Sequence, residues 1–329
     1  PGRPGPSARP AAGRREAPTH DTRTGIDGGA GSDTGEPASG ERPIGGADAS
    51  GTMASDEVRF HWTPKKGWDR FARGIRCAAR NVMNWKGRDP LPPPPGEPCW
   101  LLPTSDDVAV EIARKRVALQ RLGWFVLSCD AEVVLNLSNK ARLRDYAERM
   151  GLGGYLPEPY SSADSACFPC ILKSATGEFG KDCYIAESYE DVANLVPRGS
   201  AEDWILQELV RGSTEYSVSL LVHDGRVVDV IGTEYEYGSA AYVYPDVRKV
   251  GKRLYSVPPG HVAIMQSFLG GYSGVCNFNF KVRPDGRPCI FEVNTRIGGD
   301  LACDVPRDRA RALFQKLDSL RGRGAPSRG

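Results

Sequence analysis

The sequence predicts an α+β fold with antiparallel sheets, because short apolar runs of strand character outnumber helical ones and tight turns join several of them. Asp224-Gly225 and Asp285-Gly286 each lie between two apolar runs, and Asp-Gly is a typical hairpin turn. Helical spacing is expected over residues 189–196 and 261–268. The expected strands cover residues 168–174, 182–186, 204–209, 216–222, 227–231, 274–282 and 289–293.

A short α/β unit is expected ahead of this body, over residues 98–137. Residues 99–103 and 124–128 have strand character, and residues 106–122 form the helix between them, with Ser105 as its cap. A helix over residues 138–150, capped by Ser138, then opens the larger domain, which we place at residues 138–305.

Both ends of the chain are polar. Residues 1–52 contain no Leu, Val, Phe, Trp, Tyr, Met or Cys, so we expect residues 1–55 to be a disordered leader. Residues 56–97 are expected to hold a basic amphipathic helix, over residues 62–85, and a linker with four prolines at 92–95. That helix either docks on the main domain or binds a membrane surface or an anionic partner. The Arg-rich residues 306–329 are expected to be a polar tail that frays.

Composition excludes several functional classes. Lys and Arg number 43 against 41 acids, so the net charge of +2 gives no general reason to expect a nucleic-acid partner. No run of 18 apolar residues predicts a membrane span, and no apolar signal segment opens the chain. The nine scattered cysteines are typical of reduced, buried thiols, and the Cys167–Cys170 spacing lacks the second pair of a zinc site. We therefore expect a cytoplasmic protein.

The first candidate motif is a pair of lysines around a small loop. Lys173 ends an apolar strand, and Lys181 follows a loop that contains Gly177 and Gly180. Glycines allow backbone N–H groups to approach phosphate oxygens, and each ammonium can neutralise a phosphate charge. This motif is compatible with a polyphosphate site, and the alternative is an ordinary hairpin turn.

The second motif is a strand end followed by an acid. Gln207, Glu208, Leu209 and Val210 close one strand, and Glu215 begins the next. An extended backbone of this kind can pair with the edge of an adenine, and a carboxylate a few residues later can accept both ribose hydroxyls. The alternative is an exposed hairpin acid.

The third motif combines oxygen ligands with a guanidinium. Glu292, Asn294 and Arg296 share one face of a strand by its period of two, and Asn279 lies on the neighbouring strand. Hard oxygen ligands suit Mg²⁺, and Arg296 suits a planar anion. So many polar groups on a buried face are costly unless they bind something.

In this order, the three motifs resemble the ATP-grasp superfamily, most closely its carbamoyl-phosphate synthetase-like members, over about residues 138–301. The resemblance implies an ATP-grasp fold, in which two α+β subdomains sandwich ATP. It implies that Lys173 contacts the α- and β-phosphates and Lys181 the β- and γ-phosphates. The adenine would lie on residues 207–210 and the ribose on Glu215, and Lys140 would be a further cationic contact.

The resemblance also implies how a metal and a substrate are held. Glu292 would bridge two Mg²⁺ ions, with Mn²⁺ as a substitute, and Asn294 would bind one of them. Arg296 and Lys181 would act on the transferred phosphoryl group. Asn279 stands where many members of the superfamily have an acidic first metal ligand.

The implied activity is that of an ATP-dependent, ADP-forming ligase, which joins a small carboxylate to an amine or a carbamoyl-type group through an acyl phosphate. A non-catalytic nucleotide-binding module and a small-molecule kinase are the alternatives. The short front unit suggests a protein partner or an oligomer that completes it. The aromatic run at residues 234–244 lies where the superfamily closes its pocket, and is either a lid or a solvated loop.

Overall fold

In the computed structural model, the described residues are 59–62 and 78–79, for which only the backbone is described, and 85, 88–96, 99–175, 182–196 and 204–321. The predicted leader, the Pro1–Met53 unit included, lies outside them, as do Lys181 and residues 322–329. All the elements below belong to the unit Ala54–Gly329.

The front sheet is parallel and has the order β2-β1-β3-β4. Its strands are β1 (Arg59–Trp62), β2 (Ala78–Ala79), β3 (Cys99–Leu102) and β4 (Trp124–Phe125). The predicted basic helix over residues 62–85 is therefore wrong at Trp62 and at residues 78–79, where the backbone pairs between strands. Residues 63–77, the greater part of that helix, lie outside the described residues. Two strands of this sheet precede residue 98, the expected start of the front unit.

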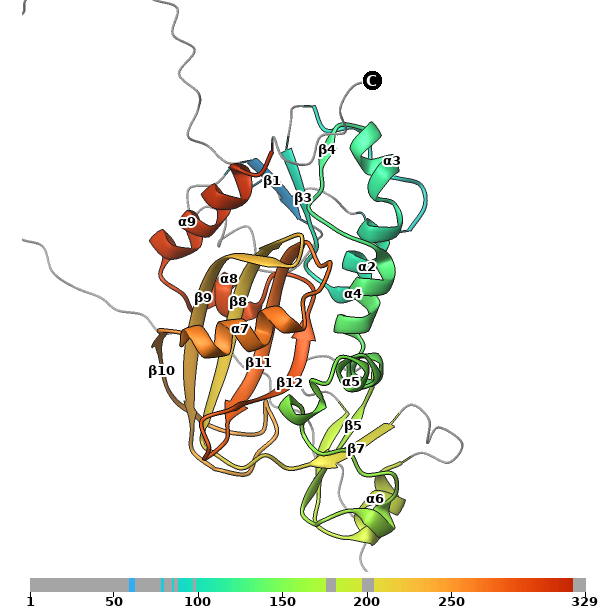
Figure 1. Cartoon of the computed structure of the whole chain (residues 1–329), viewed down its shortest axis with the longest axis vertical. Coiled ribbons are helices and arrows are strands. Elements are labelled where there is room, and N and C mark those ends of the chain that lie inside the picture. The colour runs from blue at the N-terminus through green and yellow to red at the C-terminus, as the bar shows by residue number, and fades with distance from the viewer. Residues whose placement is uncertain are drawn as a thin grey trace, which may run out of the picture. The chain divides into compact units, whose positions relative to one another are not determined.

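Helices α2 (Asp106–Arg114), α3 (Arg116–Arg121), α4 (Ala131–Ser138) and α5 (Lys140–Arg149) follow. The single helix expected over residues 106–122 is interrupted at Lys115, and Ser105 makes no side-chain cap bond. Helix α5 is capped by Asn139 and not by Ser138, because Asn139 Oδ1 accepts the N–H groups of Ala141 and Arg142 at 3.0 and 3.1 Å. In Figure 1, α3 lies beside β4 of the front sheet, and α4 and α5 lie along the side of the large sheet that β12 (Pro288–Asn294) forms.

The small sheet is antiparallel and has the order β6-β5-β7. It contains β5 (Cys170–Ser174), β6 (Cys183–Ala186) and β7 (Trp204–Glu208), and α6 (Tyr189–Leu195) follows β6. The short 3₁₀ turns η1 (Gly153–Tyr155) and η2 (Ala163–Ser165) lie between α5 and β5.

The large sheet is antiparallel throughout, with the order β10-β9-β8-β11-β12. Both predicted Asp-Gly hairpins are present, one between β8 and β9 and one between β11 and β12. At the first, Asp224 and Gly225 have φ of 48° and 74°, a left-handed conformation that favours glycine. The strands are β8 (Thr214–His223), β9 (Arg226–Tyr237), β10 (Lys249–Tyr255), β11 (Gly274–Val282) and β12 (Pro288–Asn294).

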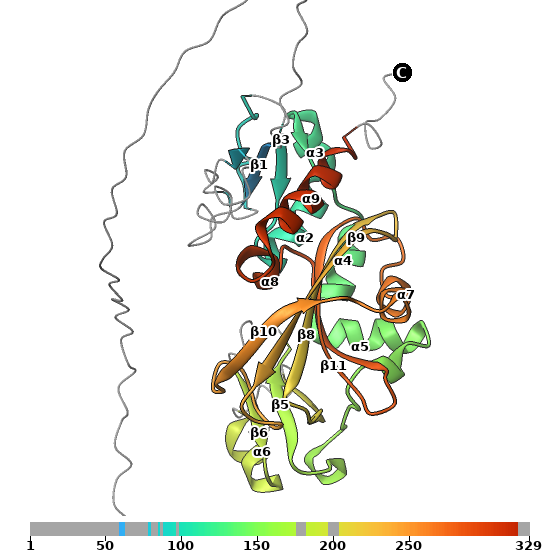
Figure 2. The same cartoon turned by 90° about the vertical axis from the view of Figure 1, so that its left-hand side faces the viewer.

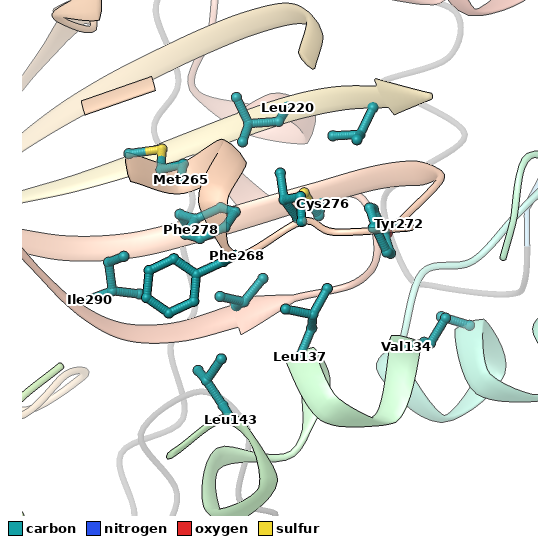
Figure 3. Packing of buried hydrophobic residues seen from close by; sticks show 14 of the residues in the cluster. Val134, Leu137, Leu143, Leu220, Met265, Phe268, Tyr272, Cys276, Phe278 and Ile290 are labelled. Atoms are coloured by element: carbon teal, nitrogen blue, oxygen red, sulfur yellow. The ribbon is translucent and has the colours of Figure 1, made fainter. Parts of the chain in front are cut away.

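Alternate residues of the large sheet supply two cores. Leu220 and Phe278 point to one face, where they pack with Leu137 of α4 and Met265 of α7 (Pro259–Ser267) (Figure 3). Leu221 points to the other face, into a separate cluster. Figure 2 shows α7 on one side of the sheet and α8 (Gly299–Cys303) and α9 (Arg307–Asp318) on the other.

Helix α9 overturns the expectation of a frayed, polar tail from residue 306. Ala310, Leu313, Phe314 and Leu317 recur at helical spacing and are buried against the second cluster. Trp100 of β3 lies in the same cluster, and its indole N–H donates to Asp318 Oδ1 at 3.0 Å. The helix therefore joins the front sheet to the large sheet.

The α+β fold class predicted from the sequence is confirmed, with helices and three sheets in the described part of the chain. Among these residues, no helix is both long enough and apolar enough to span a membrane.

Candidate active site

The small and large sheets enclose a pocket of about 160 Å³. Each of the three motifs contributes at least one predicted residue to its wall, together with Tyr242, Val243, Tyr244 and Lys281. Those that line it are Lys140, Lys173, Gln207, Glu208, Leu209, Val210, Glu215 and Glu292. Lys181 lies outside the described residues.

The strand end at Glu208 is held by its own side chain. Its two carboxylate oxygens accept N–H groups of Arg283 at 2.7 and 2.6 Å, and one of them also accepts the backbone N–H of Glu158 at 3.1 Å. The hydrogen bonds from Arg283 lower the pKa of Glu208. The carboxylate is thus engaged with Arg283, and the backbone N–H of Glu208 donates to the carbonyl of Glu158 at 2.8 Å. Leu209 and Val210 continue the wall of the pocket beyond this strand end.

Glu215 lies at the same end of the pocket and is bound by a tyrosine. Tyr242 donates its hydroxyl to Glu215 Oε2 at 2.9 Å, and burial raises the pKa of Glu215. Lys281 Nζ donates to the carbonyl of Val210 at 3.0 Å and lies 4.1 Å from the centre of the Tyr242 ring. Burial lowers the pKa of Lys281.

The sequence reasoning missed Lys281 and did not single out Tyr242 within the aromatic run. Lys281 follows Asn279 by two positions in β11, so strand alternation could have placed it on the same face. Residues 234–237 of the run belong to β9 and not to a connection between strand and helix. Residues 242–244 do line the pocket.

Two lysines mark the other end of the pocket. Lys173 is 8% exposed and donates to the carbonyl of Phe291 at 3.4 Å. Burial and the nearby charge of Lys140 lower the pKa of Lys173 to about 8. Lys140 Nζ lies 3.5 Å from Glu292 Oε2. Two ammonium groups on one side of the pocket are an arrangement that suits a phosphate group.

The predicted metal ligands form one hydrogen-bonded cluster. Glu292 Oε1 accepts the side-chain amides of Asn279 and Asn294 at 2.9 and 3.2 Å. Burial raises the pKa of Glu292, but Lys140, the two amides and Arg296 together lower it to about 2. An ionised carboxylate with two amide side chains fits a hard cation that phosphate oxygens also bind. Among the described residues, no group of three or more His, Cys, Asp or Glu could hold a metal.

Arg296 extends this cluster toward the front unit. Its Nη2 donates to Asn294 Oδ1 at 3.1 Å, and its buried Nε has no hydrogen-bond partner among the described residues. That Nε lies 3.6 Å from Oδ2 of Asp106, the first residue of α2. Asp106 Oδ1 accepts the backbone N–H and the hydroxyl of Thr295 at 2.6 and 2.9 Å. Asp106 carried no signal in the sequence, because 189 positions separate it from Thr295.

A second pocket of about 580 Å³ adjoins the first. Lys140, Glu215, Tyr244 and Glu292 line both pockets, whereas Arg296, Asn279 and Asn294 line only the second. Its wall includes the buried Asp300, which accepts Ser219 Oγ at 2.9 Å and Asn277 Nδ2 at 3.0 Å. Burial raises the pKa of Asp300 to about 6.

No protein-family model matches the sequence, and a search of curated proteins found no match. Solved structures do align. The L-amino acid ligase from Bacillus licheniformis aligns at a TM-score of 0.53 and 14% identity, over 79% of this chain and 73% of that one.

Two other structures align with lower scores. D-alanine–D-alanine ligase from Bacillus anthracis gives a TM-score of 0.49 at 11% identity, over 82% of this chain and 100% of that one. A Hydrogenobacter thermophilus 2-oxoglutarate carboxylase, its biotin carboxylase domain bound to MgADP, gives 0.46 at 16% identity. That alignment covers 70% of this chain and only 55% of the other. The likeness at these identities is one of fold.

Proposed function

We propose that this chain, which has the ATP-grasp fold, is an ATP-dependent ligase that activates a carboxylate as an acyl phosphate and joins it to an amine. The observation that carries the proposal is the shared wall of the two pockets. Lys140 and Glu292 line both, so a nucleotide whose base lies along residues 208–210 would present its terminal phosphate to the second pocket. Arg296 lines that second pocket.

The first step would transfer the terminal phosphoryl group. A carboxylate oxygen of the substrate attacks the γ-phosphorus, the bond to the β,γ-bridging oxygen breaks, and ADP leaves with that electron pair. Lys173 and Lys140 would neutralise the phosphates, and the guanidinium of Arg296, which lines the second pocket, would orient the carboxylate. Mg²⁺ held by Asn279, Glu292 and Asn294 would supply further positive charge at the phosphate oxygens.

The second step would form the amide. The amine nitrogen attacks the carbonyl carbon of the acyl phosphate, inorganic phosphate leaves, and the nitrogen loses a proton. No nucleophilic side chain is required, since positioning and charge neutralisation are sufficient for such transfers. The second pocket, at about 580 Å³, is within the usual range of small-ligand sites.

The substrates would be small carboxylic acids and amines. The aligned structure with the highest TM-score quoted above is an L-amino acid ligase, so amino acids are the first acids and amines to test.

The test is a trapping experiment with Mg-ATP, hydroxylamine and pooled carboxylic acids, amino acids included. A hydroxamate formed together with ADP and phosphate is the expected result, and Arg296→Ala should abolish it. Release of AMP and pyrophosphate would refute the acyl-phosphate route. A stable phosphorylated product that needs no amine would indicate a kinase, and nucleotide binding without turnover would indicate a non-catalytic module.

A further inference from the structure

The nucleotide pocket is small for its proposed ligand. Its volume of about 160 Å³ is below the range of about 300–1,000 Å³ that is usual for small-molecule sites. Tyr242 and Val243 form part of its wall. They also line a third cavity, of about 650 Å³, which we call the outer cavity. That outer cavity is bounded by residues of β6 and α6. Tyr242 and Val243 therefore lie between the small nucleotide pocket and the larger outer cavity.

Tyr242 is held in the wall by contacts that a nucleotide would need to break. Its hydroxyl donates to Glu215, the carboxylate expected to accept the ribose hydroxyls. Its ring lies 4.5 Å from that of Tyr237, centre to centre, and 4.1 Å from the ammonium of Lys281. The Tyr242 hydroxyl thus binds the carboxylate that a ribose would need, and the Tyr242 ring fills the space in which that ribose would lie.

The segment that carries Tyr242 is anchored near its two ends. The backbone N–H of Gly212 donates to the carbonyl of Ala240 at 2.8 Å, and Gly238 donates to Arg248 at 2.9 Å. Both bonds join backbone groups, so a rotation of the Tyr242 side chain would break neither of them.

We propose that Tyr242 is an internal competitor of the nucleotide: in the empty protein it closes the pocket by binding Glu215, and it turns into the outer cavity when a ribose takes that carboxylate. This inference rests on the proposed nucleotide site. It predicts that part of the binding free energy of any nucleotide is lost in breaking the bond between Tyr242 and Glu215. A hydrogen bond to a charged acceptor corresponds to about a tenfold to hundredfold change in an equilibrium constant.

The test is Tyr242→Phe, which removes the hydroxyl and keeps the ring against Tyr237 and Lys281. Calorimetric titration with ADP and with 2′,3′-dideoxy-ADP should show that both bind about tenfold tighter than to the wild type. The affinity of both ligands should rise by the same factor, because the bond between Tyr242 and Glu215 is present only in the protein without nucleotide. Tyr189→Phe is the matched control: Tyr189 is exposed on α6, and its substitution should leave both affinities unchanged.

Thermal melting gives a readout that a ribose contact would not reproduce. Without nucleotide, Tyr242→Phe should melt below the wild type. At saturating ADP the two should melt together, because the bond is absent from both complexes.

Four outcomes would overturn the inference. Weaker binding of ADP but not of the dideoxy analogue would make Tyr242 a ribose contact. Equal losses of melting temperature with and without ADP would mean that the bond to Glu215 persists in the complex. Unchanged affinities would overturn the competition and leave the nucleotide site standing, whereas no binding of ADP or ATP to either protein would overturn the proposed function as well.

Discussion

The ion pair between Arg283 and Glu208 should set nucleotide affinity through the backbone of residues 208–210. The pair is bidentate, at 2.7 and 2.6 Å, and its side chains are 24% and 27% exposed, so solvent screens it only in part. We expect Arg283→Gln to weaken the positioning of the strand end by about 1–2 kcal/mol, which is about 5- to 30-fold in ADP affinity. Calorimetric titration with ADP measures the change, and urea unfolding measures the cost to stability.

The same hairpin supplies a matched control. Arg287 pairs with Asp285 at 2.6 Å, but these two side chains are 56% and 46% exposed. Arg287→Gln should therefore change neither the free energy of ADP binding nor that of unfolding by more than a few tenths of a kcal/mol. Glu208→Gln combined with Arg283→Gln should cost little more than either change alone, because both remove one interaction. Equal behaviour of the two arginine variants, or additive effects of the changes at Glu208 and Arg283, would show that this ion pair does not set nucleotide affinity.

Two further predictions concern charge at the phosphate end of the pocket. Burial and Lys140 lower the pKa of Lys173 to about 8, so its ammonium is charged below that pH and neutral above it. ADP affinity should therefore be level below about pH 7.5 and fall above about pH 8 by up to tenfold per pH unit, and Lys173→Arg should remove this decline. If the decline persists in Lys173→Arg, another group titrates. Asn279→Asp adds a second carboxylate beside Glu292, so the Mg²⁺ concentration that half-saturates ADP binding should fall about tenfold, and Glu292→Gln should raise it. If neither Asn279→Asp nor Glu292→Gln changes the Mg²⁺ concentration that half-saturates ADP binding, these residues are not the metal ligands.

Strand alternation explains why the sequence could predict much of the site. Along β11 and β12 the polar residues Asn279, Glu292 and Asn294 alternate with apolar ones, such as Phe278 and Val293, that pack in the opposite core. A period of two places each set on one face without any knowledge of the rest of the fold. The Asp285-Gly286 turn predicts that β11 pairs with β12 and sets the register near the turn, where Phe280 lies opposite Ile290. A register shift between Asn279 and Phe280 then brings Asn279 opposite Glu292, and no local signal in the sequence predicts that shift.

Helix α9 shows how composition can mislead where spacing does not. The arginines at its surface make the segment look like a solvated tail, yet Leu313, Phe314 and Leu317 form a continuous apolar stripe. The opposite error occurred at residues 78–79, where helical spacing was outweighed by pairing with a distant strand. Pairing between distant strands leaves no local signal, so a periodicity argument cannot anticipate it.

The parts of the site that the sequence did not reveal are those made by contacts between distant segments. Asp106 at the start of α2 holds the backbone of Thr295 and lies beside Arg296, so the front unit helps to set the position of the guanidinium. The bond from Trp100 to Asp318 and the packing of α9 fix that unit against the large sheet. A rigid attachment is needed here, because a bond of 2.6 Å between Asp106 and Thr295 tolerates little relative motion. The front sheet therefore supports the part of the second pocket that Arg296 lines, and substitutions within the core of this sheet should change the position of Arg296 without altering a residue of either pocket.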